Sequence, residues 1–192
     1  MLAPACAMPR ARNAAATRQA MLEAARRQFA RESYENVGLR EISREVGVDP
    51  ALVCRYFGSK EGLFKDVLRH PGDGEFLADV TAETLPHYFA GLLTEPDGAD
   101  WAAKADWLLI VLRSAGSPQA SAMVREAIKG GVLDPVANLI GGPDAELRAS
   151  LVLTVLMGSK VLRTVMAVEG CCSGDSDVLH AKLVHLLSAA IE

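Results

Sequence analysis

Arg55 is a side chain whose type and position suit sequence-specific recognition in this 192-residue chain. Its guanidinium can donate two hydrogen bonds to O6 and N7 of guanine, a contact worth roughly 1 to 3 kcal/mol of base discrimination. If Val53 and Phe57 face a core, the helical period of about 3.6 residues turns Arg55 and the small Ala51 outward. Leu52 then lies where an apolar side chain can touch a thymine methyl group. The spacing therefore predicts a helix that contacts base edges in duplex DNA.

Polar and cationic side chains near this helix are suited to holding the DNA backbone. Arg40, Arg44 and Lys60 carry the charge that phosphates attract, and Ser43 and Tyr56 offer hydroxyl groups. The amides at the start of the helix beside Lys60 would add the positive end of its dipole. The complete predicted DNA-binding set is Arg40, Ser43, Arg44, Pro50, Ala51, Leu52, Cys54, Arg55, Tyr56 and Lys60. Solvated charges on a small helical bundle are the alternative interpretation.

Charge is divided unevenly along the chain, although the net charge is only -4. Residues 1–70 contain 12 Lys and Arg against 8 Asp and Glu, whereas residues 71–192 contain 8 against 16. A basic segment favours a polyanion such as nucleic acid, and the acidic remainder would be repelled by one. We therefore expect any nucleic acid to contact the N-terminal third of the chain. Uneven scatter of surface charge is the alternative explanation.

An amphipathic helix is predicted from Thr17, which is a suitable N-terminal cap. Met21, Ala25 and Phe29 recur every fourth residue, as expected of a helix face that packs on a core. We interpret residues 1–16, which contain Arg10 and Arg12 and no acidic side chain, as a disordered basic arm.

A tight turn separates two short helices farther along the chain. Gly47 is a natural end for the first of them, whose apolar face carries Leu39, Ile42 and Val46. Asp49 can cap the second, and Pro50 suits its first position because a missing N–H costs nothing there. Ser59 caps a further helix. Two short helices joined in this way form a helix-turn-helix, whose second helix enters the major groove. We assign the helix-turn-helix DNA-binding domain to residues 17–70.

The rest of the chain is predicted to form longer helices, because no segment alternates as a strand would. These helices span about residues 75–93, 100–115, 118–140, 143–168 and 175–191, with the sharpest break at residues 141–143. The expected fold is all-α, with about nine helices. It consists of an N-terminal three-helix helix-turn-helix domain and a C-terminal helical bundle over residues 71–192.

The stretch from Thr17 to Leu68 resembles the DNA-binding domain of the tetracycline-repressor (TetR) family of bacterial regulators, with some likeness to actinobacterial members. The motifs that carry the resemblance are Ile42-Ser-x-x-x-Gly-Val48, the pair Tyr56-Phe57 and the helix start Ser59-Lys60-Glu61. It implies a ligand-responsive repressor that binds a palindromic operator as a homodimer. The sequence departs from the family pattern at Gly38 and Cys54, where many members have a hydroxyl residue and a tyrosine that contact the DNA backbone.

Two C-terminal segments are apolar on almost every side, and we expect them to pair with a second copy of the chain. In a chain of this size, one side of each helix can face its own core while another side contacts a partner. The residues predicted at this interface are Leu151, Val155, Leu162, Val165, Leu179, Leu183 and Leu187. A monomeric bundle in which both helices are central is the alternative.

The resemblance implies a small-molecule pocket among the middle helices of the C-terminal part. The candidate lining residues are His87, Trp101, Trp107, Leu112, Arg113, Met123 and Met157. Apolar walls with few polar groups suit a hydrophobic or aromatic effector. Each of these residues could instead be ordinary core, because Trp and Met at helical spacing are packing residues first.

Several other function classes are disfavoured by the sequence. His70, His87, His180 and His185 form no recognisable catalytic or metal-binding array, so we expect neither an enzyme nor a metal or other cofactor. The longest apolar stretch, residues 151–168, contains two cationic side chains and is not a membrane span. Cysteine usage fits the cytoplasm. A helical small-molecule carrier or scaffold that never binds DNA is the alternative function.

Overall fold

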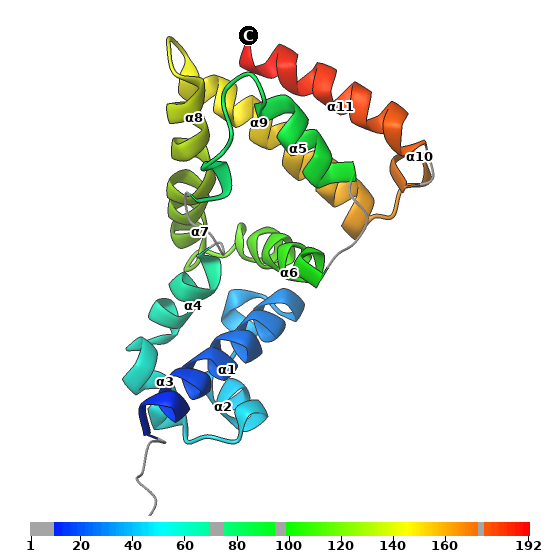
Figure 1. The fold of residues 1–192 in the computed structure, drawn as a ribbon. Coiled ribbons are helices and arrows are strands. Elements are labelled where there is room, and N and C mark those ends of the chain that lie inside the picture. The colour runs from blue at the N-terminus through cyan, green and yellow to red at the C-terminus, as the bar shows by residue number, and fades with distance from the viewer. Residues whose placement is uncertain (1–9, 70–74, 95–98, 173–174) are drawn as a thin grey trace, which may run out of the picture. The chain divides into compact units, whose positions relative to one another are not determined.

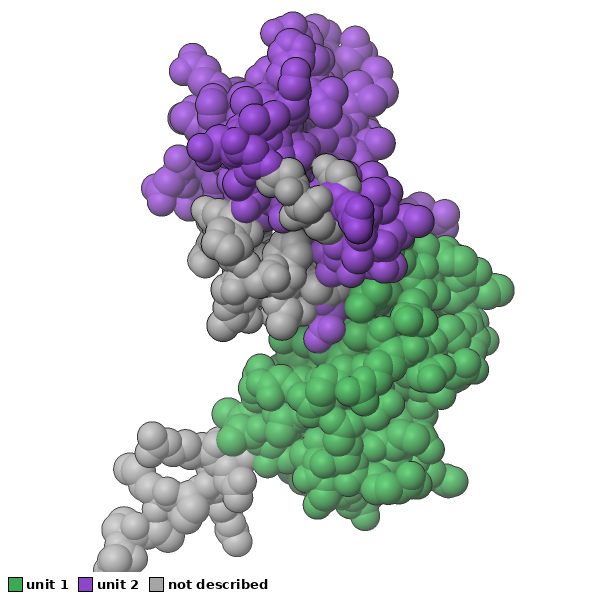
Figure 2. All heavy atoms as spheres, turned by 90° about the vertical axis from the view of Figure 1, so that its right-hand side faces the viewer, with its two compact units in different colours: residues 1–68, 109–123 green, residues 69–108, 124–192 purple. Residues whose placement is uncertain are grey.

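The computed structural model describes residues 10–69, 75–94, 99–172 and 175–192 (Figure 1). Within these ranges every regular element is a helix, which confirms the all-α expectation. The chain divides into two compact units, which Figure 2 colours separately. Unit 1 takes in the residues up to Leu68 together with Leu109–Met123, and unit 2 takes in Arg69–Leu108 and Val124–Glu192. The segment 109–123 thus groups with the N-terminal helices. The predicted domain boundary at residue 70 had placed this segment in the C-terminal domain.

The first N-terminal helix begins earlier than the sequence suggested, and the others begin where they were expected. They are α1 Arg10–Arg31, the single turn η1 Tyr34–Asn36, α2 Leu39–Val46, α3 Pro50–Phe57 and α4 Lys60–Leu68. Residues 10–16 are therefore helical, and the expectation that they form a disordered arm was wrong. Ala14, Ala15 and Ala16 favour the helix strongly, so Thr17 is not its first turn. Residues 1–9 of the expected arm lie outside the described part.

Aromatic packing forms the centre of unit 1. Met21, Ala25 and Phe29 are completely buried, which confirms the predicted inner face of α1. The ring of Phe29 lies 6.0 Å from that of Tyr34 and 4.8 Å from that of Phe64, measured between centroids. The rings of Tyr34 and Phe64 are 4.9 Å apart. These contacts join α1, η1 and α4 into one core. Helix α2 packs on α1, and α3 packs on α2 and α4.

The remaining helices follow the predicted order, with changes at their ends. They are η2 Glu75–Leu77, α5 Leu85–Thr94, α6 Ala99–Ser114, α7 Ser121–Ile128, α8 Asp134–Ile140, α9 Ala145–Lys160, α10 Glu169–Cys172 and α11 Ser176–Ile191. A π-helical turn, Lys129–Leu133, joins α7 to α8, and a second one, Val161–Val165, extends α9. Segments 118–140 and 143–168 therefore contain helices close to the expected lengths.

The first of the longer helices is shorter than predicted. Instead of starting near residue 75, α5 starts at Leu85. Thr81 and Thr84 exchange hydrogen bonds just before it: the Thr81 amide donates to Thr84 Oγ1 at 2.9 Å, and the Thr84 amide donates to Thr81 Oγ1 at 3.3 Å. Hydroxyl groups that bind nearby backbone amides compete with helix and favour its ends. Pro86 then fits the first turn, where no amide is needed.

Unit 2 is built around α11. Helices α5 and α9 both pack on it, and α8 packs on α9 (Figure 1). Phe89 from α5, Val152 from α9, and Leu183 and Leu187 from α11 meet in its buried core. The two inward leucines of α11 lie four residues apart, so one helix face is committed to the chain's own interior.

Candidate nucleic-acid interface

The turn between α2 and α3 has the geometry that its residues predict. Gly47 adopts the left-handed conformation, with φ 74° and ψ 34°, which glycine reaches without steric cost. Its amide donates to the carbonyl of Arg44 at 3.2 Å and closes the end of α2. The Asp49 side chain accepts a hydrogen bond of 2.7 Å from the Ala51 amide, and Pro50 occupies the first turn of α3. The predicted helix-turn-helix is therefore present.

The outer face of α3 presents the residues expected to contact bases. Val53 is completely buried and Phe57 is 8% exposed, so these two side chains face the core as predicted. Ala51 and Arg55 are exposed on the opposite side. Further members of the predicted set on this helix are exposed or half-buried: Pro50, Leu52, Cys54 and Tyr56. The exposed face of α3 thus presents the Arg55 guanidinium beside the small side chains of Ala51 and Cys54, on a helix that a DNA groove can accommodate.

Helix α2 presents two arginines, but its serine is unavailable. Arg40 and Arg44 are exposed one turn apart. Ser43 is 2% exposed, and its hydroxyl donates to the Arg40 carbonyl at 2.9 Å. The prediction that Ser43 contacts a phosphate was therefore wrong, because a buried hydroxyl bonded within its own helix cannot reach DNA. Among the described residues, Arg40, Arg44 and Arg55 have no ion-pair partner.

Lys60 is only partly available to a phosphate. Its ammonium lies 4.5 Å from the centroid of the Tyr34 ring and donates to the Glu35 carbonyl at 3.4 Å. Burial lowers the pKa of Lys60, while the charges of Glu35 and Glu61 oppose that shift. Burial, together with the charge of Glu61, raises the pKa of Tyr34 to about 12. Lys60 thus supports the junction between η1 and α4, and a contact with phosphate remains a prediction.

Most acidic side chains around the helix-turn-helix have cationic or polar partners. Asp66 on α4 pairs with Arg18, whose guanidinium also lies 4.8 Å from the Phe57 ring centroid. Glu45 on α2 accepts hydrogen bonds of 2.8 Å from Gln28 and from Arg27 on α1. These two bonds hold the pKa of Glu45 below its usual value. Because Asp66 and Glu45 are paired with arginines of α1, neither neutralises the outward arginines of α2 and α3.

The two parts of the chain match two models of one protein family. Residues 21–67 match "Bacterial regulatory proteins, tetR family", and residues 83–191 match "Tetracyclin repressor-like, C-terminal domain". The chain belongs to the TetR family. The second match spans most of the C-terminal part, so membership does not rest on the helix-turn-helix alone. The family is one of bacterial regulatory proteins, and its relative AcnR is a transcriptional repressor.

Curated relatives support the actinobacterial affinity suggested by the sequence. The chain is 35% identical over 86 residues to the HTH-type transcriptional repressor AcnR of Corynebacterium glutamicum, a match that covers 44% of this chain and 45% of AcnR. It is 39% identical over 82 residues to the HTH-type transcriptional regulatory protein RaaS of Mycobacterium tuberculosis, covering 43% of this chain and 34% of RaaS. The chain thus spans less than half the length of these relatives.

Solved structures share the fold of this chain at low sequence identity. A transcriptional-regulator structure from Saccharomonospora viridis in complex with choline is 20% identical, with a TM-score of 0.61, and covers 90% of this chain and 96% of that one. A mutant HlyIIR protein with a segment substituted by alanine is 16% identical, with a TM-score of 0.51, and covers 95% and 99%. These likenesses concern the fold alone.

An apolar stripe on α9 and on the π-helical turn that extends it is exposed in this TetR-family chain. On α9, Leu147 and Leu151 are 60% and 45% exposed. In the π-helical turn, Leu162 and Val165 are 39% and 45% exposed. Val178 and Leu186 on α11 are exposed as well. Leu151, Leu162 and Val165 of the predicted dimer set are thus on the surface. The C-terminal helices therefore carry apolar surface that a partner could cover.

Two members of the predicted dimer set face the chain's own core instead. Leu183 is 4% exposed and Leu187 is 1% exposed, so assigning them to a partner interface was wrong. The cause is their position on the side of α11 that packs on α5 and α9. Val155 and Leu179 are partly buried against the same core. An apolar pattern on all sides cannot tell which side meets the partner.

The predicted pocket residues that the structure describes are divided between the two units. His87, Trp107 and Met157 belong to unit 2, whereas three others belong to unit 1: Leu112, Arg113 and Met123. Leu112 is 41% exposed and Arg113 is exposed, so neither lines a buried pocket, contrary to expectation. Met123 is buried in unit 1. The side chain of Trp101 lies outside the described residues.

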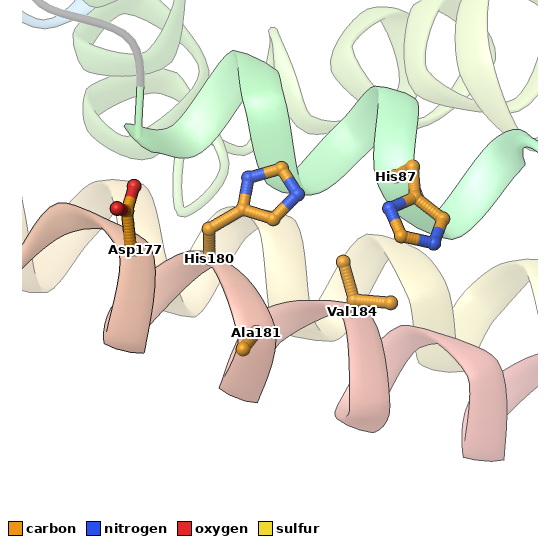
Figure 3. Close-up of a pocket in the computed structure, with 5 residues that line it drawn as sticks. All are labelled: His87, Asp177, His180, Ala181 and Val184. Carbon is orange, nitrogen blue, oxygen red and sulfur yellow. The ribbon is translucent and has the colours of Figure 1, made fainter.

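A hollow in unit 2 contains one predicted residue and several that the sequence reasoning missed. It has a volume of about 500 Å³ and is lined by His87, Asp177, His180, Ala181 and Val184 (Figure 3). His87 comes from α5, and the other four lie on one face of α11. His180, Ala181 and Val184 follow Asp177 by three, four and seven residues, which is the spacing of one helix face. This spacing does not indicate that His87 of α5 lies opposite that face.

Proposed function

We propose that this chain is a DNA-binding transcriptional regulator that reads its operator with α3. The observation that carries the proposal is the outward face of α3, where Arg55 is exposed and has no ion-pair partner among the described residues. A guanidinium left free in this way keeps both donors for a guanine edge. Arg40 and Arg44, exposed on α2, supply charge for the phosphates that set the register of α3.

The active form in this proposal is a homodimer. The exposed leucines of α9 and the exposed apolar residues of α11 support it, because a partner that covers them removes a large apolar surface from water. A two-fold axis presents two copies of α3 about one or more helical turns apart on DNA. The operator is then a near-palindrome. Binding of one half-site holds the second α3 near the other half-site, so the dimer binds DNA more tightly than either subunit alone.

Regulation by a small hydrophobic or aromatic effector completes the proposal. A ligand that binds one arrangement of the two DNA-binding heads better than another shifts the population and releases the operator. Repression is favoured over activation because AcnR, which is similar to this chain over 86 residues, is a repressor. The protein would act in the cytoplasm, where the operator is. None of the helices within the described residues has the length and apolar character needed to cross a bilayer.

Selection of bound duplexes from a random pool tests this function. Wild-type protein should recover two inverted half-sites, and Arg55→Ala should lower discrimination at one position of each half-site by about 1 to 3 kcal/mol. Arg125→Ala is the matched control, since Arg125 is an exposed arginine on α7. Recovery of no preferred sequence at low salt, where phosphate contacts are strongest, would contradict DNA recognition by this chain and favour a carrier.

A further inference from the structure

Two histidines from different helices face each other across the hollow of unit 2. His87 is exposed on α5, and His180 is half-buried on α11. Their ring centroids are 5.9 Å apart with an interplanar angle of 39°. Figure 3 shows a ring nitrogen of each histidine turned toward the other ring. The pair therefore presents two nitrogen ligands to the same small region of space.

Thr94 lies beside one ring nitrogen of His180. Its Oγ1 donates to the Ala90 carbonyl at 2.9 Å, within the last turn of α5. The same oxygen lies 3.4 Å from His180 Nδ1. In the tautomer that carries its proton on Nδ1, His180 donates to this oxygen and has a lone pair on Nε2. Histidines that bind metals are held in this way, with the second nitrogen donating to an oxygen.

The two rings are close enough to share a metal ion after a small side-chain movement. Zinc lies about 2.0 to 2.1 Å from a histidine nitrogen, which places it roughly 3.2 Å from the ring centroid, so two histidines at a tetrahedral angle have centroids about 5.2 Å apart. The 5.9 Å between these two rings is wider by less than about 1 Å. The hollow of about 500 Å³ leaves room for water molecules to complete a tetrahedral shell. Asp177 also lines the hollow, but Figure 3 shows it on the other side of His180 from His87.

We propose that His87 and His180 form a binding site for a divalent transition-metal ion of the zinc class. The described residues contain no cluster of three or more His, Cys, Asp or Glu side chains able to hold a metal, so the site has two protein ligands and open positions. A bound ion would join α5 to α11, two helices that pack closely in unit 2. The site does not depend on DNA binding, and its test is separate from that of the proposed function.

Calorimetric titration of the untagged, reduced full-length chain with zinc chloride tests the site. We expect one ion per chain, with affinity lowered more than about tenfold in His87→Ala and in His180→Ala. His185→Ala is the matched control, because His185 is an exposed histidine on the same helix as His180 and lies outside the hollow. It should bind zinc as the wild type does. His87→Gln repeats the test with a side chain of similar size if the alanine variant folds poorly.

Thr94→Val separates metal binding from a general effect on packing. It removes the hydroxyl that orients His180 but keeps the shape of the side chain, and it should weaken zinc binding about tenfold. Cobalt is a second probe, since its absorption spectrum distinguishes nitrogen from thiolate ligands. A thiolate spectrum, equal zinc affinity in all the histidine variants, or no binding by the wild type would overturn the proposal.

Discussion

Ser117 donates a hydrogen bond from its buried hydroxyl to the carboxylate of Glu35, although the two residues are 82 positions apart. Ser117 belongs to the segment between α6 and α7 that groups with unit 1, and Glu35 lies in η1, just before the helix-turn-helix. The Ser117 oxygen also accepts a bond of 2.9 Å from the Ala120 amide. This serine therefore ties a segment from the middle of the chain to the DNA-binding helices.

Ser117→Ala should reduce stability in a pH-dependent way. The Ser117 bond is the main cause that holds the pKa of Glu35 below its usual 4.5. A carboxylate with a lowered folded-state pKa stabilises the fold above its unfolded pKa, and that contribution disappears as the pH falls through the folded value. Loss of the hydrogen bond from the Ala120 amide to Ser117 Oγ lowers the unfolding free energy by about a further 1 kcal/mol at every pH.

Urea unfolding of wild type and Ser117→Ala at one protein concentration measures this effect. The difference in unfolding free energy should be largest near pH 7. It should narrow below about pH 4.5, as Glu35 protonates first in the unfolded chain and then, at lower pH, in the folded protein. Ser121→Ala, at the start of α7, should show no such narrowing. A difference between wild type and Ser117→Ala that is the same at pH 7 and pH 3.5 would mean that the Glu35 bond contributes nothing.

Gly62→Ala should destabilise the DNA-binding unit. A Cβ atom at this position would clash with the backbone carbonyl oxygen of Phe57 and lie 3.3 Å from its carbonyl carbon. Backbone cannot move aside as a flexible side chain can, so the end of α3 or the start of α4 must shift. Overpacking of this kind typically costs about 1 to 3 kcal/mol.

Thermal unfolding of Gly62→Ala is best compared with Gly116→Ala. Gly116 also lies in unit 1, and a Cβ there would meet nothing within 4 Å. The control should remain within about 0.5 kcal/mol of wild type, as open surface substitutions usually do. Equal stability of the two variants would show that α3 and α4 are not packed as closely as described.

Arg44→Ala and Ser43→Ala should affect DNA binding differently. Arg44 is exposed and has no ion-pair partner among the described residues, so its loss should weaken binding to all sequences alike and lower the salt slope by about 1. Ser43 bonds within α2, so its loss should leave affinity unchanged. Fluorescence anisotropy at several salt concentrations measures both. A larger loss of affinity in Ser43→Ala than in Arg44→Ala would reverse this assignment.

Leu151→Glu should prevent dimer formation without unfolding the chain. Leu151 is 45% exposed in the centre of the α9 stripe, where a carboxylate would be buried against a second copy at high cost. Leu112→Glu is the control, because Leu112 is similarly exposed on α6. Sedimentation velocity should show a dimer for wild type and control and a monomer for Leu151→Glu. A dimer in all three would place the interface elsewhere.

The helix-turn-helix could be predicted from sequence because its signals are local. Gly47, Asp49 and Pro50 each have a backbone preference that acts within one turn. The burial of Val53 and Phe57 follows from helical periodicity on an element with one apolar face. The burial of Ser43 could not be predicted in the same way. Ser43 follows Ile42 at the edge of the apolar face of α2, and a serine there can point either to the core or to solvent.

The C-terminal part shows where the periodic signal fails. Leu183 and Leu187 are as apolar as Leu151, and only the packing of α11 on α5 and α9 decides which of them are covered by their own chain. The sequence by itself determined the helices, their principal breaks and the outward Arg55, because these depend on neighbouring residues. Tertiary structure decided the bond between Ser117 and Glu35 and the pairing of histidines across two helices, because such contacts join residues far apart in the chain and leave no periodic trace.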